Sequence, residues 1–129
     1  MNSQKKQSST TIELTQEALA NLREIEQYSA EGWGRRTAER YLDDLATALD
    51  RLAENPDILR MEPDFAPNLY FYRVNKHFLV CDYCGNLVIV LAVIHASMNI
   101  PKRLQELEPR LIAEVQLIRK KLNPPRPDR

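Results

Sequence analysis

The sequence predicts an α+β domain with two layers, in which a helix hairpin covers one face of an antiparallel sheet. Apolar residues recur at steps of three and four through segments 16–29 and 36–54, as expected of two amphipathic helices. Three short apolar runs separated by tight turns follow between residues 69 and 94, as expected of antiparallel strands. Because the helices precede the run of strands, the order favours segregated α and β layers.

The first thirty residues predict a tail, a strand and a helix. Residues 1–10 are polar and predict a disordered tail. Residues 11–14 alternate polar and apolar side chains, as in a short strand. Thr15 is placed to cap a helix from Gln16 to about Ser29, with Tyr28 on its apolar stripe.

Gly32-Trp33-Gly34 interrupts the helical pattern and predicts the turn of the hairpin. We expect Trp33 to pack the end of the hairpin onto the core, because its ring is a large apolar surface. The second helix is predicted from about Arg36 to Glu54, since Asn55-Pro56 is a stop signal. Its apolar stripe comprises Ala38, Tyr41, Leu42, Leu45, Ala48, Leu49 and Leu52.

Residues 56–68 contain three prolines and predict a loop. Strands are predicted at 69–74, 78–83 and 87–94, and the last is apolar on both faces, as in a central strand. A helix starting near Pro101 should be kinked or divided at Pro109. Its apolar side chains must pack on the chain's own body, on a second copy in a homodimer, or in the groove that a binding partner would occupy; we favour the chain's own body or a homodimer over nucleic acid. They are Leu111, Ile112, Val115, Ile118 and Leu122.

The composition is that of an ordinary globular domain. Of 129 residues, 43% are apolar and 28% charged. Eighteen basic and eighteen acidic residues cancel, so the net charge gives no argument for nucleic-acid binding. No apolar run approaches the ~18 residues that cross a membrane. Because the start lacks a signal-peptide pattern, we expect a cytoplasmic protein that does not bind membranes.

Cys81 and Cys84 have CxxC spacing, but they end a predicted strand. A redox pair needs its first cysteine at a helix N-terminus, where the thiolate is stabilised. The sequence has no second cysteine or histidine pair at zinc spacing, no phosphate-binding loop and no dinucleotide fingerprint. We therefore expect two free cysteines, no metal and no cofactor.

The order of elements and several motifs resemble the ParE/RelE superfamily, the small toxins of bacterial toxin–antitoxin pairs. The resemblance rests on LTQEALANLREIEQYSAEGWGRRTAERYLDDL, LAENP, a strand pair and VLAVIHASMNIPKRL. WGRRTAERYLDDL and IHASMNIP are more similar to the ParE, or plasmid-stabilisation, branch. The resemblance covers residues 11–107 and implies a RelE/ParE-like fold with the first strand beside the last. A helical extension and Pro-rich tail, residues 108–129, lie outside the usual extent.

The resemblance implies a toxin that acts by binding DNA gyrase and is neutralised by a ParD-like antitoxin. Two alternatives remain open: a RelE-like, ribosome-dependent mRNA endonuclease, and a non-toxic member of the superfamily that retains only partner binding. A toxin that acts only by binding needs no catalytic residue, so we expect none in that case. A nuclease without a metal would need a base for the 2′-hydroxyl and cations for the phosphorane, and the candidates are Arg73, Lys76, His77 and His95.

The nuclease hypothesis is weakened by the residues at the matching positions. Lys76 and His77 stand where the RelE branch starts its third strand with an arginine, and His95 stands at a second arginine position. We expect His95 to be a polar strand end whose ring bonds nearby backbone, and His77 to be a solvated turn residue.

The resemblance also implies an antitoxin segment laid in a groove beside the helix hairpin and the sheet, and this groove is the third place considered above for the apolar side chains that follow Pro109. Tyrosines give broad contact area and arginines suit acidic partner segments. In the alternative interpretation, Tyr70 and Tyr72 only cover the core and do not contact an antitoxin. The candidate antitoxin-binding residues are Arg40, Tyr41, Tyr70, Tyr72 and Arg73.

Overall fold

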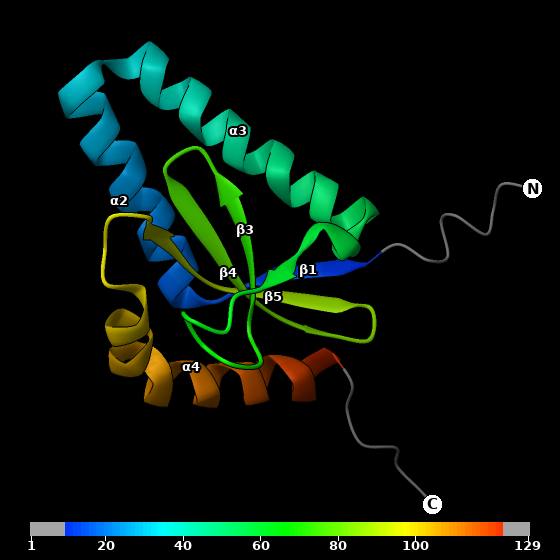
Figure 1. The fold of residues 1–129 in the computed structure, drawn as a ribbon. Coiled ribbons are helices and arrows are strands. Elements are labelled where there is room, and N and C mark those ends of the chain that lie inside the picture. Colours follow the sequence, from blue (N-terminus) through cyan, green and yellow to red (C-terminus); the bar gives the residue numbers. More distant parts are fainter. Residues whose placement is uncertain (1–9, 123–129) are drawn as a thin grey trace, which may run out of the picture.

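A computed structural model describes residues 10–122, and nearly all of the predicted N-terminal tail, together with the Pro-rich end, lies outside the described residues. The α+β fold is confirmed (Figure 1). Its elements are β1 (Thr11–Leu14), α2 (Gln16–Trp33), α3 (Arg35–Glu54), the 3-10 helix η1 (Pro56–Ile58), β2 (Arg60–Met61), β3 (Tyr70–Val74), β4 (His77–Cys84), β5 (Leu87–His95) and α4 (Ile100–Leu122).

The strands form one sheet in the order β1-β5-β4-β3-β2. β1 runs parallel to β5, as the resemblance implied, and every other neighbouring pair is antiparallel. The prediction of a plain loop over residues 56–68 was wrong in part, because this segment contains η1 and the two-residue strand β2. A two-residue strand is too short to leave a periodic pattern in the sequence, so only pairing with β3 reveals it.

The helix hairpin turns later than predicted. α2 continues through Gly32 to Trp33, and the chain reverses at Gly34 with φ 94°, a value that side chains with a Cβ rarely adopt. A single glycine inside a helix costs only about 1 kcal/mol relative to alanine, which was not enough to end α2 at Ser29. Thr15 caps the helix as predicted, since its Oγ1 accepts the N–H of Ala18 at 3.0 Å.

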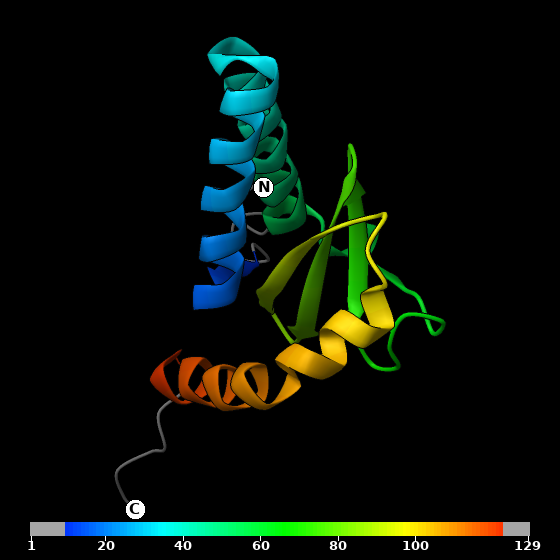
Figure 2. The ribbon, with the colours of Figure 1, turned by 90° about the vertical axis from the view of Figure 1, so that its left-hand side faces the viewer.

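Two separate apolar clusters lie on the two faces of the sheet. The hairpin packs on one face, where Leu45 and Leu52 meet Leu79 and Val90. α4 packs on the opposite face, where Leu104, Leu107 and Leu111 are buried with Phe71 and Ile89, among others. Figures 1 and 2 show the hairpin and α4 on different sides of the strands. Of the three partners considered for the extension, the structure thus provides the chain's own sheet.

A β-bulge changes the phase of β5 in its middle. The β4–β5 register passes from Val80 opposite Ala92 to Cys81 opposite Val90, so Leu91 is the extra residue. Leu91 and Ala92 consequently belong to the same cluster on the α4 face. Beyond the bulge, the odd-numbered side chains of β5 face the hairpin.

Thr15, which caps α2, and Asn21 within α2 hydrogen-bond to β5 beyond the end of β1. The Thr15 hydroxyl is buried and donates to the Leu91 carbonyl at 2.7 Å, and the Thr15 N–H donates to the Val90 carbonyl at 3.1 Å. Further along, Asn21 Oδ1 accepts the N–H of Val93 at 2.9 Å. Backbone groups that an edge strand would expose are therefore satisfied, and the start of α2 is fixed against the end of β5.

α4 runs as one helix through Pro109, so the proline does not divide it. Figure 2 shows that the helix changes direction part-way along, as expected where a proline removes a backbone donor and its ring crowds the preceding turn. Among residues 10–122, no helix is both long and apolar enough to cross a membrane.

Candidate functional site

A groove of about 660 Å³ lies between α2 and the paired ends of β4 and β5. We call it the histidine groove. Six of its lining residues carry the argument: Tyr28, Trp33, Lys76, His77, His95 and Met98.

The two histidines meet across the sheet. His77 begins β4 and is the cross-strand partner of His95, which ends β5. Their ring centroids lie 5.0 Å apart with nearly perpendicular planes. Both side chains line the groove, and the bulge at Leu91 is the reason that His95 shares the hairpin face with His77.

His77 is held by the second helix of the hairpin. Its Nδ1 lies 2.5 Å from the Tyr41 hydroxyl, and that hydroxyl accepts the N–H of Lys76 at 3.1 Å. Burial, with a smaller effect of His95, lowers the pKa of His77 from 6.5 to about 4, so the ring is neutral at pH 7. The expectation of a solvated turn residue was wrong, because a partner 36 residues away in sequence covers the ring.

His95 bonds nearby backbone, as predicted. Its Nδ1 accepts the N–H of Ser97 at 3.0 Å and lies 2.8 Å from Ser97 Oγ. A nitrogen that accepts a backbone N–H carries no proton itself, so this hydrogen bond leaves Nε2 as the ring nitrogen that can donate. The Ala96 N–H donates to the Lys76 carbonyl at 2.8 Å, which ties the end of β5 to the β3–β4 turn.

Large apolar side chains at the groove are exposed. Tyr28 is 73% exposed, and Trp33 and Met98 are each 49% exposed. The predictions that Tyr28 joins the buried stripe and that Trp33 plugs the core were wrong. Figure 2 shows that the closed end of the hairpin extends beyond the sheet, which leaves these rings little to pack on. The Trp33 ring lies 6.4 Å from that of Tyr41, with Lys76 Nζ 5.6 Å from its centroid.

The structure brings together three of the four nuclease candidates. Lys76, His77 and His95 line the histidine groove, whereas Arg73 lies on the opposite face of the sheet, with its guanidinium 5.4 Å from the Phe78 ring centroid. A neutral His77 whose Nδ1 is already hydrogen-bonded to the Tyr41 hydroxyl is a poor general acid at pH 7. Within the described residues, no three His, Cys, Asp or Glu side chains gather as they would around a metal ion.

The five candidate antitoxin-binding residues do not share one surface. Tyr70 and Tyr72 are partly buried and pack against the hairpin-face cluster, and Tyr41 belongs to that cluster. Arg73 points to the α4 face, as strand alternation requires, and Arg40 is exposed on α3. Tyr41 is the member of this set that lines the histidine groove.

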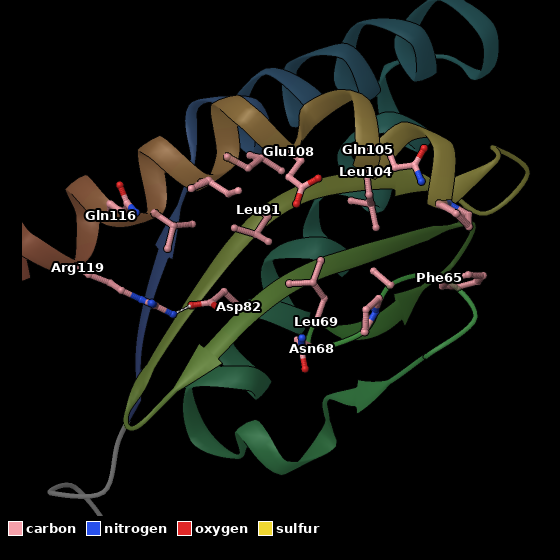
Figure 3. A pocket seen from close by; sticks show the side chains of 16 residues that line it. Phe65, Asn68, Leu69, Asp82, Leu91, Leu104, Gln105, Glu108, Gln116 and Arg119 are labelled. Atoms are coloured by element: carbon pink, nitrogen blue, oxygen red, sulfur yellow. Dashed lines mark hydrogen bonds and ion pairs between the residues drawn. The ribbon is translucent and has the colours of Figure 1, made fainter.

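A second groove of about 590 Å³ lies between α4 and the sheet (Figure 3). Leu69, Leu91 and Leu104 point into it, and Arg119 of α4 forms an ion pair with Asp82 of β4. Sequence reasoning missed this groove because its walls come from three distant segments. The alternation of β4 could have placed Asp82 on the face away from the hairpin, but nothing in the sequence placed α4 above it.

The cysteines are free, as predicted. Cys81 is buried in the hairpin-face cluster and Cys84 is exposed. Burial raises the pKa of the Cys81 thiol well above its usual range, so this group is unreactive at neutral pH.

Residues 12–100 match the sequence profile of the family described as "ParE toxin of type II toxin-antitoxin system, parDE". The chain belongs to the ParE toxin family. It is 31% identical to Toxin ParE of Escherichia coli over 98 residues, which cover 75% of this chain and 95% of that toxin. It is 34% identical to Toxin ParE1 of Mycobacterium tuberculosis over 92 residues, which cover 70% of this chain and 94% of the relative.

A solved structure described as "Chromosomal ParDE TA system from P. aeruginosa" has the same fold. The TM-score is 0.61, with 14% sequence identity, over 70% of this chain and 99% of that chain. The ParE-like assignment made from the motifs is therefore confirmed. The family profile ends at residue 100, where α4 begins, so nearly all of α4 lies outside the segment that the profile matches.

Proposed function

We propose that this ParE-type toxin of a type II toxin–antitoxin system acts in the cytoplasm by binding DNA gyrase, and that a ParD-like antitoxin neutralises it. The observation that supports binding over catalysis is the state of the two histidines. His77 is neutral at pH 7, and both His77 and His95 use Nδ1 in hydrogen bonds within the fold. The two arginines expected of a RelE-type site are absent from the matching positions.

The choice of partners is supported by family membership. Gyrase is the target implied by the ParE resemblance, and the solved structure with the same fold is described as a ParDE system. Arg40, Tyr41, Tyr70, Tyr72 and Arg73 remain candidate contacts for the antitoxin. Because these residues lie on different faces, the antitoxin would have to wrap around the hairpin to reach all five.

The test is induced expression of the chain without antitoxin, scored for growth arrest, DNA-damage response and transcript cleavage. We expect growth arrest with a DNA-damage response and intact transcripts. Co-expression of a cognate ParD-like antitoxin should restore growth. Purified toxin should also inhibit gyrase supercoiling in vitro.

His77→Ala and His95→Ala distinguish binding from catalysis. Loss of a catalytic acid or base lowers a rate by about 10²–10⁴-fold, so nuclease activity could not survive it. For a binding toxin, we expect both variants to fold, as checked by circular dichroism, and to arrest growth nearly as well as the wild type. A folded variant that has lost both toxicity and transcript cleavage would establish the endonuclease.

The endonuclease remains the second candidate because Lys76, His77 and His95 converge on one groove. Transcript cleavage at the ribosome in the wild type, without gyrase inhibition, would favour it. A chain that binds the antitoxin but never arrests growth would instead be the non-toxic superfamily member.

A further inference from the structure

We propose that the groove between α4 and the sheet, which we call the α4 groove, binds a small organic cation, namely a primary amine or a guanidine carried on an apolar body. This groove lies on the face of the sheet opposite the histidine groove, and the proposal does not depend on the target of the toxin. Its failure would therefore leave the proposed function untouched.

The first argument is the shape and the lining of the α4 groove. Its volume of about 590 Å³ lies within the range of about 300–1,000 Å³ that is typical of small-molecule sites. The inner lining is apolar, because Leu91 is 4% and Leu104 7% exposed, and the bulge in β5 places Leu91 on this face. Phe65 and Leu69, which precede β3, line it as well (Figure 3). A ligand with an apolar body would thus be enclosed by α4, the sheet and the segment before β3.

The second argument is the charge of the lining. Two carboxylates, of Asp82 and Glu108, stand against one guanidinium, of Arg119, which leaves one negative charge. Arg119 is already engaged, because it forms an ion pair with Asp82. Glu108 has no ion-pair partner within residues 10–122, and Figure 3 shows its side chain pointing from α4 into the groove. A cation complements this carboxylate, whereas an anion would have to displace Asp82 from Arg119.

The third argument is a backbone acceptor close to Glu108. Pro109 lies inside α4 and has no N–H, so it cannot donate to the carbonyl of Gln105 four residues earlier. Gln105 and Glu108 are three residues apart on one side of the helix, and both line the groove. A cation that pairs with Glu108 therefore has a second acceptor within the same turn. An ammonium group has three N–H donors and a guanidinium has five, so either can serve both acceptors.

The distribution of apolar surface favours a small molecule over a protein partner. Among the residues that line the α4 groove, Ile112 is the large apolar side chain that is exposed, at 51%. Leu117 is 66% exposed but does not line the groove. A stable protein interface buries about 800 Å² on each partner around an apolar centre. The apolar surface here is instead confined to a concave space.

The experiment titrates the isotope-labelled full-length chain with phenylbutylamine and follows the backbone amide shifts by NMR. Phenylbutanol and phenylpentanoate carry the same apolar body with a neutral and an anionic head group. We expect saturable shifts at Leu69, Leu91 and Gln105 but not at Trp33 of the histidine groove, with a dissociation constant on the order of 1 mM, as is ordinary for a ligand of this size. The alcohol should bind about threefold more weakly, and the carboxylate should not saturate the groove.

Two pairs of variants test the charge and the apolar lining. Glu108→Gln removes the carboxylate, and Glu106→Gln is its control, because Glu106 lies on the same helix but does not line the groove. We expect Glu108→Gln to bind the amine no better than the alcohol, while Glu106→Gln keeps the preference for the amine. Ile112→Ala should weaken the binding of amine and alcohol alike, about twofold to threefold, and Leu117→Ala should weaken neither.

The amide spectrum of each variant shows whether it is folded before a ligand is added. Equal affinities of the wild type for the amine and the alcohol overturn the proposal, because the groove would then be an apolar site without charge recognition. A preference for the amine that persists in folded Glu108→Gln also overturns it, as does the absence of saturable shifts at the α4 groove. Shifts centred on Trp33 would assign the cation to the other face of the sheet and overturn it too.

Discussion

The helix hairpin and α4 bury apolar side chains on opposite faces of the same sheet, but they leave different spaces behind. Under the middle of the hairpin, the gap has only about 110 Å³ and purely apolar walls, whereas the histidine groove, with about 660 Å³, lies towards the closed end of the hairpin. Under α4, the groove has about 590 Å³ and includes Asp82, Glu108 and Arg119. The hairpin belongs to the segment shared with the ParE family, whereas α4 follows it. The closely packed middle of the hairpin face thus lies within the matched segment, and the looser opposite face is covered by a helix that follows that segment.

The helix hairpin and α4 also differ in the interactions that attach them to the rest of the chain. α4 is tied to the start of α2 by ion pairs from Arg103 and Arg110 to Glu17, and by a hydrogen bond from the Gln16 N–H to Glu114. Partly exposed ion pairs each contribute about 0–1 kcal/mol, so they orient the helix more than they stabilise it. We expect the second half of α4 to unfold locally before the hairpin does.

The largest expected effect tests the hairpin face. Leu45 is 2% exposed and borders the small gap, so Leu45→Ala enlarges a cavity that the helices cannot easily close. We expect the free energy of unfolding to fall by about 2–5 kcal/mol. Leu117→Ala is the control, because Leu117 on α4 is 66% exposed. Urea unfolding of both variants makes the comparison, and an unchanged Leu45→Ala midpoint would refute our placement of this stripe.

The next effect tests the α4 face. Truncation after Pro109 removes the buried Leu111, the partly buried Val115 and Ile118, and the pairs made by Arg110 and Arg119. We expect a loss of about 2–3 kcal/mol, near the value for one buried leucine and its partly buried neighbours. Melting curves report the stability, and light scattering reports whether the exposed face then associates. A truncated chain with the same melting temperature, mass and antitoxin affinity would show that the extension does none of this.

We expect acid to lower the stability of the fold by protonating His77, which lies on the hairpin face of the sheet. Its pKa is about 4 in the folded chain and 6.5 when unfolded, so the unfolded state binds more protons between these values. The stabilisation is complete above pH 6.5 and is lost as the pH falls towards 4. Because the ring is partly exposed, we expect a loss of about 1–2 kcal/mol, below the full value of the shift. Urea unfolding at pH 7 and 4.5 should show a smaller difference for His77→Gln than for wild type. Equal differences would remove His77 as the cause.

The smallest effect concerns the two arginines, which lie on different surfaces. Arg40 is exposed on α3 and Arg73 is exposed on the α4 face of β3. Charge reversal, Arg40→Glu or Arg73→Glu, should weaken antitoxin binding by about 0.2–1 kcal/mol each, with a loss that shrinks at high salt. Calorimetric titration at two salt concentrations provides the measurement. If both variants bind with wild-type affinity at low salt, the antitoxin docks elsewhere.

Much of the architecture was predictable because it depends on local periodicity. The stripe through Leu45 and Leu52, the cap at Thr15 and the three strands of the meander each follow from a pattern within a few residues. The ring of His95 also behaves as expected, since its partner, Ser97, is two residues away. Tyr28 and Trp33 were misplaced because helical spacing identifies a face but does not say how far the sheet beneath it extends.

The histidine groove depends on contacts that the sequence does not encode locally. Tyr41 reaches His77 from α3 and lies 36 residues earlier in the chain. If β5 were regular, the alternation of its side chains would have put His95 on the α4 face. One extra residue at Leu91 reverses that phase, because side chains on a strand alternate with a period of two. The sequence by itself determined the helices, the strands and the ParE resemblance. Only the tertiary structure brought His77 and His95 together, because the β4–β5 register and its bulge depend on pairing between strands rather than on a local pattern.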